Sequence, residues 1–173
     1  MAIRDVLQFG NPLLRESCRE VRDFATGEVL QTQQDLSDTL HDLQSAHNKG
    51  GGLAAPQIGS LLRIVYINAR GRSFHLCNPV IVERSEDTFE VWDFCFSARA
   101  SFLAQVTRNR SIRVEYQDAT GQHHDETFEG YFSELLQHEI DHLDGVLFID
   151  RIENPATLTM VEEWDKHHVY SQE

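Results

Sequence analysis

The spacing of apolar residues predicts three helices in the chain. Residues 32–48 carry leucines and an alanine at helical intervals, and Lys49 followed by three glycines ends this period. A second helix is predicted over residues 131–144, with Gly145 in a C-cap position. A third is expected to begin near Pro155, whose fixed φ suits a first helical turn, and to run to the C-terminus. Its apolar positions are Leu158, Val161 and Trp164.

Other segments have the composition of β-strands. Residues 61–67 and 74–82 contain runs of β-branched and aromatic side chains. Residues 112–116 alternate between apolar and polar side chains and are followed by a turn at residues 118–121. We expect at least some of these strands to pair in antiparallel fashion. The predicted fold class is α+β, with antiparallel sheets packed around the second helix, an N-terminal helix and a C-terminal helix.

Length and charge narrow the function classes. A chain of 173 residues with 40% hydrophobic content is long enough for one ordinary core, so a single domain over residues 1–173 is expected. A net charge of −13 argues against binding to nucleic acid, which would require clustered lysine and arginine. The N-terminus lacks the apolar stretch of a signal peptide, and no membrane span is present in the sequence, so we expect a cytoplasmic protein without a membrane partner. Three cysteines make a disulfide framework improbable.

The strongest chemical signal is the pentapeptide His-Glu-Ile-Asp-His at residues 138–142. On a helix, His138 and His142 share a face and are able to bind one metal ion, while Glu139 is placed to reach a water bound to that ion. The same pattern also arises by chance on a solvated amphipathic helix. Apolar residues on both sides of the motif indicate a buried helix instead, in which histidine and glutamate need partners that a metal supplies. We therefore predict a metallohydrolase.

A catalytic site of this kind needs a third protein ligand and an open position. A downstream histidine, as in one large protease class, is ruled out because Phe148 occupies that position. Asp144 and Asp150 stay candidates, although Asp144 follows His142 too closely to point the same way. Cys95 lies in an aromatic stretch that would shield a thiolate from oxidants. The competing interpretation makes Cys95 a small buried hydrophobic residue, as we expect for the other two cysteines.

Three segments carry a resemblance to a known family. They are Gly-Gly-Gly-Leu-Ala-Ala-Pro-Gln at residues 50–57, Cys-Phe-Ser at 95–97 and Gln-His-Glu-Ile-Asp-His-Leu-Asp-Gly at 137–145. In order and spacing they resemble the three motifs of the peptide deformylases. Residues 9–15 and 114–121 are also similar to that family, so the resemblance covers nearly the whole chain through Arg151.

The resemblance implies one divalent metal ion held by Cys95, His138 and His142. In this family the ion is commonly iron(II) in the cell, and zinc, nickel or cobalt are accepted by such a ligand set in purified protein. A hydroxide on the ion would attack a formyl carbon, with Glu139 as general base and then general acid. The implied function is the removal of the N-formyl group from formyl-methionyl peptides or nascent chains. Action on nascent chains would bring a transient association with the ribosome.

The resemblance also implies binding groups for the substrate. The side-chain amide of Gln57 and the backbone N–H of Phe96 would donate hydrogen bonds to the oxyanion. The competing interpretation of Gln57 is a polar residue that ends a glycine-rich turn. The glycines would let an extended substrate backbone approach closely. They are Gly50, Gly51 and Gly52.

The chain departs from the family pattern around the expected substrate pocket. Phe94 stands where the family has glycine, and Gly51 stands where a branched aliphatic residue is usual, so Phe94 is a candidate to fill the space at Gly51. Glu134 lies one turn before His138, near the metal pocket, where a carboxylate would disfavour an apolar substrate side chain; the alternative is that Glu134 turns to solvent.

Asp93 replaces the family's usual glutamate and is placed to pair with Arg108, which would brace the cysteine loop. The alternative is an exposed pair of little effect.

Three hypotheses follow. The first is a peptide deformylase acting on formyl-methionyl chains. The second is a deformylase-like hydrolase for another N-formylated or small amide substrate, which the three pocket departures favour. The third is a binding protein without turnover, against which the retained Glu139 argues, because binding alone needs no proton shuttle.

Overall fold

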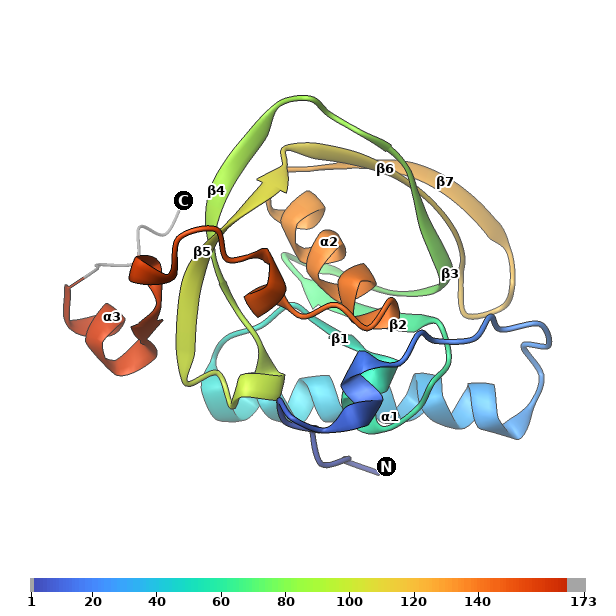
Figure 1. Cartoon of the computed structure of the whole chain (residues 1–173). Coiled ribbons are helices and arrows are strands. Elements are labelled where there is room, and N and C mark those ends of the chain that lie inside the picture. The colour runs from blue at the N-terminus through green and yellow to red at the C-terminus, as the bar shows by residue number, and fades with distance from the viewer. Residues whose placement is uncertain (1, 168–173) are drawn as a thin grey trace.

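The computed structural model of the chain describes residues 2–167 and contains antiparallel sheets with three helices (Figure 1). The helices are α1 (Gly27–His47), α2 (Tyr131–Leu143) and α3 (Val161–His167). The strands are β1 (Gly52–Ala54), β2 (Ile64–Ala69), β3 (Arg72–Arg84), β4 (Thr88–Phe94), β5 (Phe102–Asn109), β6 (Ser111–Gln117), β7 (His123–Glu129) and β8 (Thr159–Met160). The predicted α+β class is confirmed.

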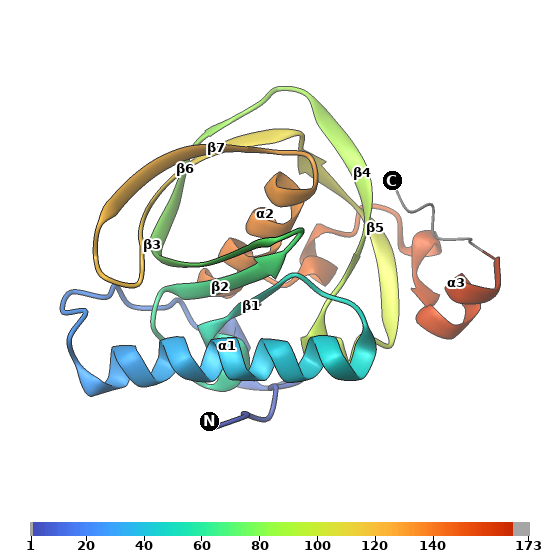
Figure 2. The same cartoon turned by 180° about the vertical axis from the view of Figure 1, so that it is seen from behind.

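The strands form two sheets in which every neighbouring pair is antiparallel. One sheet has the order β1-β2-β3-β6-β7 and the other has the order β4-β5-β8. Helix α2 lies inside the fold, with β4 and β5 on one side and the larger sheet curving around it (Figure 1). Helix α1 runs along the outside of the molecule and packs on β1 and β2 (Figure 2). The sheets therefore enclose α2, whose residues 138–142 are the His-Glu-Ile-Asp-His motif.

Helix α2 is held by burial of its apolar face against the larger sheet. Leu136, Ile140 and Leu143 are buried at helical intervals and pack with apolar residues of β2, β3 and β6 in one core cluster. The helix ends where predicted. Asp144 is its C-cap, and Gly145 follows with φ of +73°, a conformation that glycine adopts without a steric penalty.

Helix α1 begins five residues before the predicted start. The hydroxyl of Thr26 accepts a hydrogen bond from the N–H of Val29 at 3.3 Å, which caps the helix, so residues 27–31 form a first turn that the prediction did not include. At the other end Asn48 adopts a left-handed conformation and stops the helix just before the glycines.

The prediction of a helix beginning near Pro155 is wrong. Pro155 starts a single 3-10 turn, in which the side chain of Asn154 accepts a hydrogen bond from the N–H of Ala156. Residues 159–160 then pair with the edge of β5, and Leu158 is exposed before α3 begins at Val161. The edge of β5 therefore interrupts the expected helix. The predicted extension of this helix over residues 168–173 lies outside the described residues.

Among residues 2–167, none of the helices has the combined length and apolar character that crossing a membrane requires.

Candidate active site

Helix α2 presents both histidines of the motif on its buried face. His138 and His142 are one turn apart, and their ring centroids are 5.0 Å from each other. The side chain of Glu139 is buried beside them. The burial that the apolar flanks predicted is therefore present, and these polar groups lie in the interior, where each needs a partner.

Cys95 comes to the same point from the end of β4. Its Sγ lies 3.2 Å from Nε2 of His142, and one ligand atom from each of Cys95, His138 and His142 falls within 4.8 Å of the others. The two aspartates considered as ligands lie elsewhere: Asp144 pairs with Arg63, and Asp150 pairs with Arg15 at the surface.

This set of donors fits a divalent metal ion. A buried thiol and two buried imidazoles converge, and one carboxylate oxygen of Glu139 lies beside them, buried and without a hydrogen-bond partner in the described part of the chain. Sulfur and imidazole nitrogen are the ligands that zinc, iron and related transition metals accept. Two protein segments that are distant in sequence thus supply three ligands and a nearby base.

A buried network of charged side chains contacts the Nδ1 side of the His138 ring. Oδ1 of Asp93 lies 2.8 Å from Nδ1 of His138, which leaves Nε2 of that ring for the metal. Arg108 contacts Asp93 at 3.0 Å and Asp141 at 2.7 Å. Burial alone would raise the pKa of Asp93, but the charges and hydrogen bonds of His138 and Arg108 lower this pKa below its ordinary value. The predicted Asp93 and Arg108 pair is present, and the alternative of an exposed loop pair is wrong.

The side chain of Gln57 is held at both ends. Its Oε1 accepts a hydrogen bond from the N–H of Ala54 at 2.9 Å, so its amide nitrogen faces the opposite way. That nitrogen lies 3.2 Å from Oγ of Ser97 and 3.4 Å from Sγ of Cys95. The amide is buried and oriented toward Cys95, which argues against a purely turn-ending role.

Glu139 lies directly against the glycine segment. A Cβ atom added to Gly52 would lie 2.8 Å from Cγ of Glu139, so a side chain at this position would displace the carboxylate. Burial, with a smaller contribution from the charge of Asp93, raises the pKa of Glu139 to about 7. A carboxyl group with a pKa near neutrality is suited both to accept and to return a proton.

A cavity of about 220 Å³ opens beside these residues. Besides Gln57, Cys95, His138 and Glu139, it is lined by the three glycines, by the aromatic residues Trp92, Phe94, Phe96 and Tyr131, and by Lys49, Asp93, Glu134 and Leu135. Each residue that the sequence assigned to substrate binding therefore borders one cavity, which Cys95 and His138 also line.

The departures from the family pattern are accommodated differently than expected. The hydroxyl of Tyr131 and the side chain of Leu135 occupy the space that a side chain on Gly51 would need. Phe94 does not fill that space; it packs edge-on against Phe96 with 6.1 Å between ring centroids. Glu134 lines the cavity rather than turning away into solvent, and burial raises the pKa of its carboxyl group to about 7.

Comparison with known proteins places the chain in a family. A family model described as "Polypeptide deformylase" matches residues 3–157. The chain belongs to the peptide deformylase family. The peptide deformylase of Heliobacterium modesticaldum is 38% identical over 160 residues, which cover 89% of this chain and 97% of that protein. The peptide deformylase of Thermus thermophilus is 35% identical over 170 residues, covering 89% of this chain and 84% of that protein.

Solved structures of peptide deformylases have the same fold. A crystal structure from Legionella pneumophila superposes with a TM-score of 0.81 at 33% identity, covering 90% of this chain and 89% of that one. A peptide deformylase from Synechococcus elongatus, solved in complex with actinonin, gives a TM-score of 0.81 at 30% identity over 94% of this chain and 85% of that one. The resemblance drawn from three short motifs is confirmed, and the chain is an enzyme of the deformylase type.

Sequence reasoning missed two residues of the site. Asp141 lies inside the helical motif and links Arg108 to Arg151, with contacts of 2.7 Å to each. Tyr131 forms part of the pocket wall from the first turn of α2. The signal for Tyr131 was its position seven residues before His138, which is close to two helical turns and therefore on the same face.

Proposed function

We propose that this protein hydrolyses the N-formyl group of formylated peptides at the site formed by Cys95, His138 and His142. The observation that carries the proposal is the convergence of a complete set of metal donors, a base and an oriented amide on one cavity in a chain of this family. The products would be formate and a peptide with a free amino group.

A divalent ion held by Cys95, His138 and His142 would supply Lewis-acid polarisation and would lower the pKa of a coordinated water. Iron(II) is the expected ion in the cell, because the ligand set accepts several metals and availability decides among them.

The residues of the chain would perform the proton transfers and the charge stabilisation. Glu139 would accept the proton of the attacking water and then deliver it to the nitrogen of the leaving amine as the bond between carbonyl carbon and nitrogen breaks. The side-chain amide of Gln57 and the backbone N–H of Phe96 would donate to the carbonyl oxygen as negative charge develops on it. Because Ala54 fixes the orientation of the Gln57 amide, this donor would not need to reorganise during the reaction.

Two candidate substrates follow from different observations. Membership of the family favours formyl-methionyl peptides or nascent chains, for which transient contact with the ribosome in the cytoplasm is also proposed. The carboxylate of Glu134 on the cavity wall favours a different N-formylated compound, since an apolar side chain would leave this carboxylate without a partner. In either case we propose that the whole chain acts as one domain.

The test is the release of formate from formyl-Met-Ala-Ser by protein loaded anaerobically with iron(II) or nickel(II). We expect formate and the free amino group of Met-Ala-Ser to appear in equal amounts. If neither metal supports formate release from any formylated tripeptide, the deformylase assignment is abandoned.

A further inference from the structure

Part of the cavity wall combines aromatic and acidic side chains. Three aromatic side chains, Trp92, Phe94 and Tyr131, border it together with the carboxylate of Glu134. Trp92 and Phe94 come from β4, whereas Tyr131 and Glu134 come from the first turns of α2. A cavity wall that combines aromatic side chains with a carboxylate is suited to an organic cation, because aromatic rings and a carboxylate both attract positive charge.

Glu134 is the acidic side chain of this cavity to which the proposed reaction gives no role. Asp93 already contacts His138 and Arg108, and Glu139 lies at the reacting position against Gly52. In the part of the chain that the structure describes, the carboxylate of Glu134 has neither a hydrogen bond nor an ion pair, and only its backbone N–H donates, to the carbonyl of Gly130 at 3.0 Å. Burial raises the pKa of its carboxyl group to about 7, which reflects the free-energy cost of keeping this charge in the pocket without a partner.

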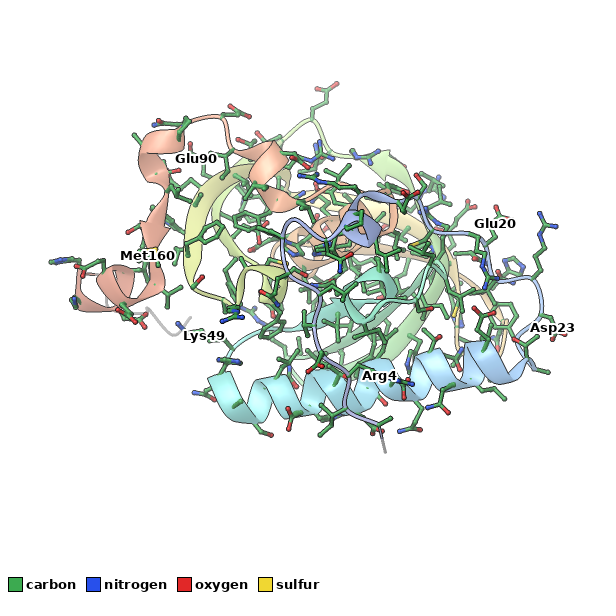
Figure 3. All side chains as sticks on the ribbon, turned by 60° about the horizontal axis from the view of Figure 1, so that its bottom comes forward. Arg4, Glu20, Asp23, Lys49, Glu90 and Met160 are labelled. Atoms are coloured by element: carbon green, nitrogen blue, oxygen red, sulfur yellow. The ribbon has the colours of Figure 1, made fainter. Side chains whose placement is uncertain are left out.

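Three cations lie near the cavity, and each has another contact. Arg108 contacts Asp93 and Asp141, as described above. The guanidinium of Arg70 stacks on the ring of Tyr131, 4.4 Å from its centroid. Lys49 is at the rim and pairs with Asp165 of α3 at 3.5 Å; Figure 3 shows it projecting from the end of α1 toward α3. Within residues 2–167 none of the three reaches ion-pair distance of Glu134. Burial is the largest contribution and raises the pKa of Glu134, whereas the charges of Arg108, His138 and Arg70 lower it through space by less.

We propose that this pocket selects N-formylated substrates whose first side chain is basic, of the lysine or arginine type, over the thioether of methionine. The alkyl stem would pack between the aromatic walls, and the cationic end would pair with Glu134. The inference rests on the deformylation proposed above and names the side chain that the same site accepts. The acidic net charge of −13 would also attract such substrates.

The experiment compares formate release from three tripeptides that differ in the first residue: formyl-Lys-Ala-Ser, formyl-norleucine-Ala-Ser and formyl-Met-Ala-Ser. Norleucine has the stem of lysine without its charge. For the wild type we expect kcat/KM to be about tenfold or more higher for the lysine peptide than for the norleucine peptide, equivalent to about 1.4 kcal/mol. Glu134→Gln keeps the shape of the side chain and should remove this preference. Glu134→Leu should reverse it.

The matched control is Glu86→Gln, which removes the same charge from an exposed position between β3 and β4 and should keep the wild-type preference. Metal content and thermal midpoint of each variant would show that the site is loaded and folded. A wild type that prefers norleucine or methionine, or a preference for lysine that survives in Glu134→Gln, overturns the inference while deformylation stands. No formate from any of the three peptides overturns the proposed function, and the inference with it.

Discussion

At the scale of single residues, Asp93 has the most demanding position in the molecule. It lies between a histidine of the proposed metal site and a buried arginine, and its carboxylate contacts them at 2.8 and 3.0 Å. Residues that orient a ligating histidine in this way affect metal binding although they do not touch the metal. We predict that Asp93→Asn weakens metal affinity by about 10–100-fold, measured by competition with a chelator of known affinity.

Asp87→Asn is the control for this change. Asp87 forms an exposed ion pair in which its Oδ2 lies 2.6 Å from Nε of Arg110. Exposed pairs contribute little, so metal affinity should stay at the wild-type value. Wild-type affinity in Asp93→Asn would contradict the role assigned to the buried network.

Gln57 provides the second prediction at this scale. Its amide is fixed by Ala54 and faces Cys95 of the proposed metal site, so the loss of this donor should raise the barrier without unfolding the site. For Gln57→Leu we expect kcat to fall by about 10²–10³, equivalent to about 3–4 kcal/mol, with a smaller change in KM. The measurement is steady-state formate release. A higher KM with kcat retained would assign Gln57 to substrate binding instead.

At the scale of elements, the glycine segment and α2 are shaped to fit one another. The hydroxyl of Tyr131 stands where a Cβ on Gly51 would be, and Cδ2 of Leu135 would lie 3.0 Å from that atom. We predict that Gly51→Ala destabilises the protein by about 1–3 kcal/mol through overpacking. Tyr131→Phe removes the crowding hydroxyl and should restore part of this loss when combined with Gly51→Ala.

Urea denaturation of the two single variants and the double variant gives the coupling between the positions. Additive effects would mean that Tyr131 does not occupy the space at Gly51.

The elements also show what the sequence could predict. Helix α2 has a buried apolar stripe at helical spacing, so its start and its chemistry followed from the pattern, and the burial of His138 followed from the apolar flanks. Strands β4 and β5 were not predicted, because their polar and charged residues include Asp93 and Arg108, which are buried as partners of one another rather than by hydrophobicity. The local periodicity of hydrophobic residues does not reveal an ion pair between residues that lie on different strands.

The same limit explains the pocket. The motifs placed Cys95, His138, Glu139 and Gln57 together correctly. The filling of the space at Gly51 by Tyr131, and the orientation of Glu134 into the cavity, depend on how α2 packs against β1. The sequence pattern does not determine this tertiary packing, so it could not predict what fills the space at Gly51 or whether Glu134 faces the cavity or solvent.

At the scale of the whole molecule, two buried thiols are expected to make the protein less stable at alkaline pH. Cys18 and Cys77 belong to the two main core clusters, and burial raises the pKa of each from 9.0 to about 11. The folded state therefore holds these protons more tightly than the unfolded chain does. The stability that the protonated thiols contribute is complete below pH 9 and is lost as pH rises through about 11.

We predict that the urea midpoint of the wild type falls between pH 9 and 11, and that it falls less steeply in Cys18→Ala/Cys77→Ala, which lacks both groups. An equal slope in the two proteins would show that these thiols titrate alike in the folded and unfolded states.

The central claim is that a metal site with Glu139 as its proton shuttle removes formyl groups. The most direct measurement is formate release by anaerobically prepared iron(II) protein, wild type against Glu139→Ala, on the formylated tripeptides named above, with one metal ion per chain verified in both proteins. The account predicts turnover by the wild type and a loss of about 10²–10⁴ in Glu139→Ala. Turnover that is unchanged in metal-loaded Glu139→Ala would contradict it.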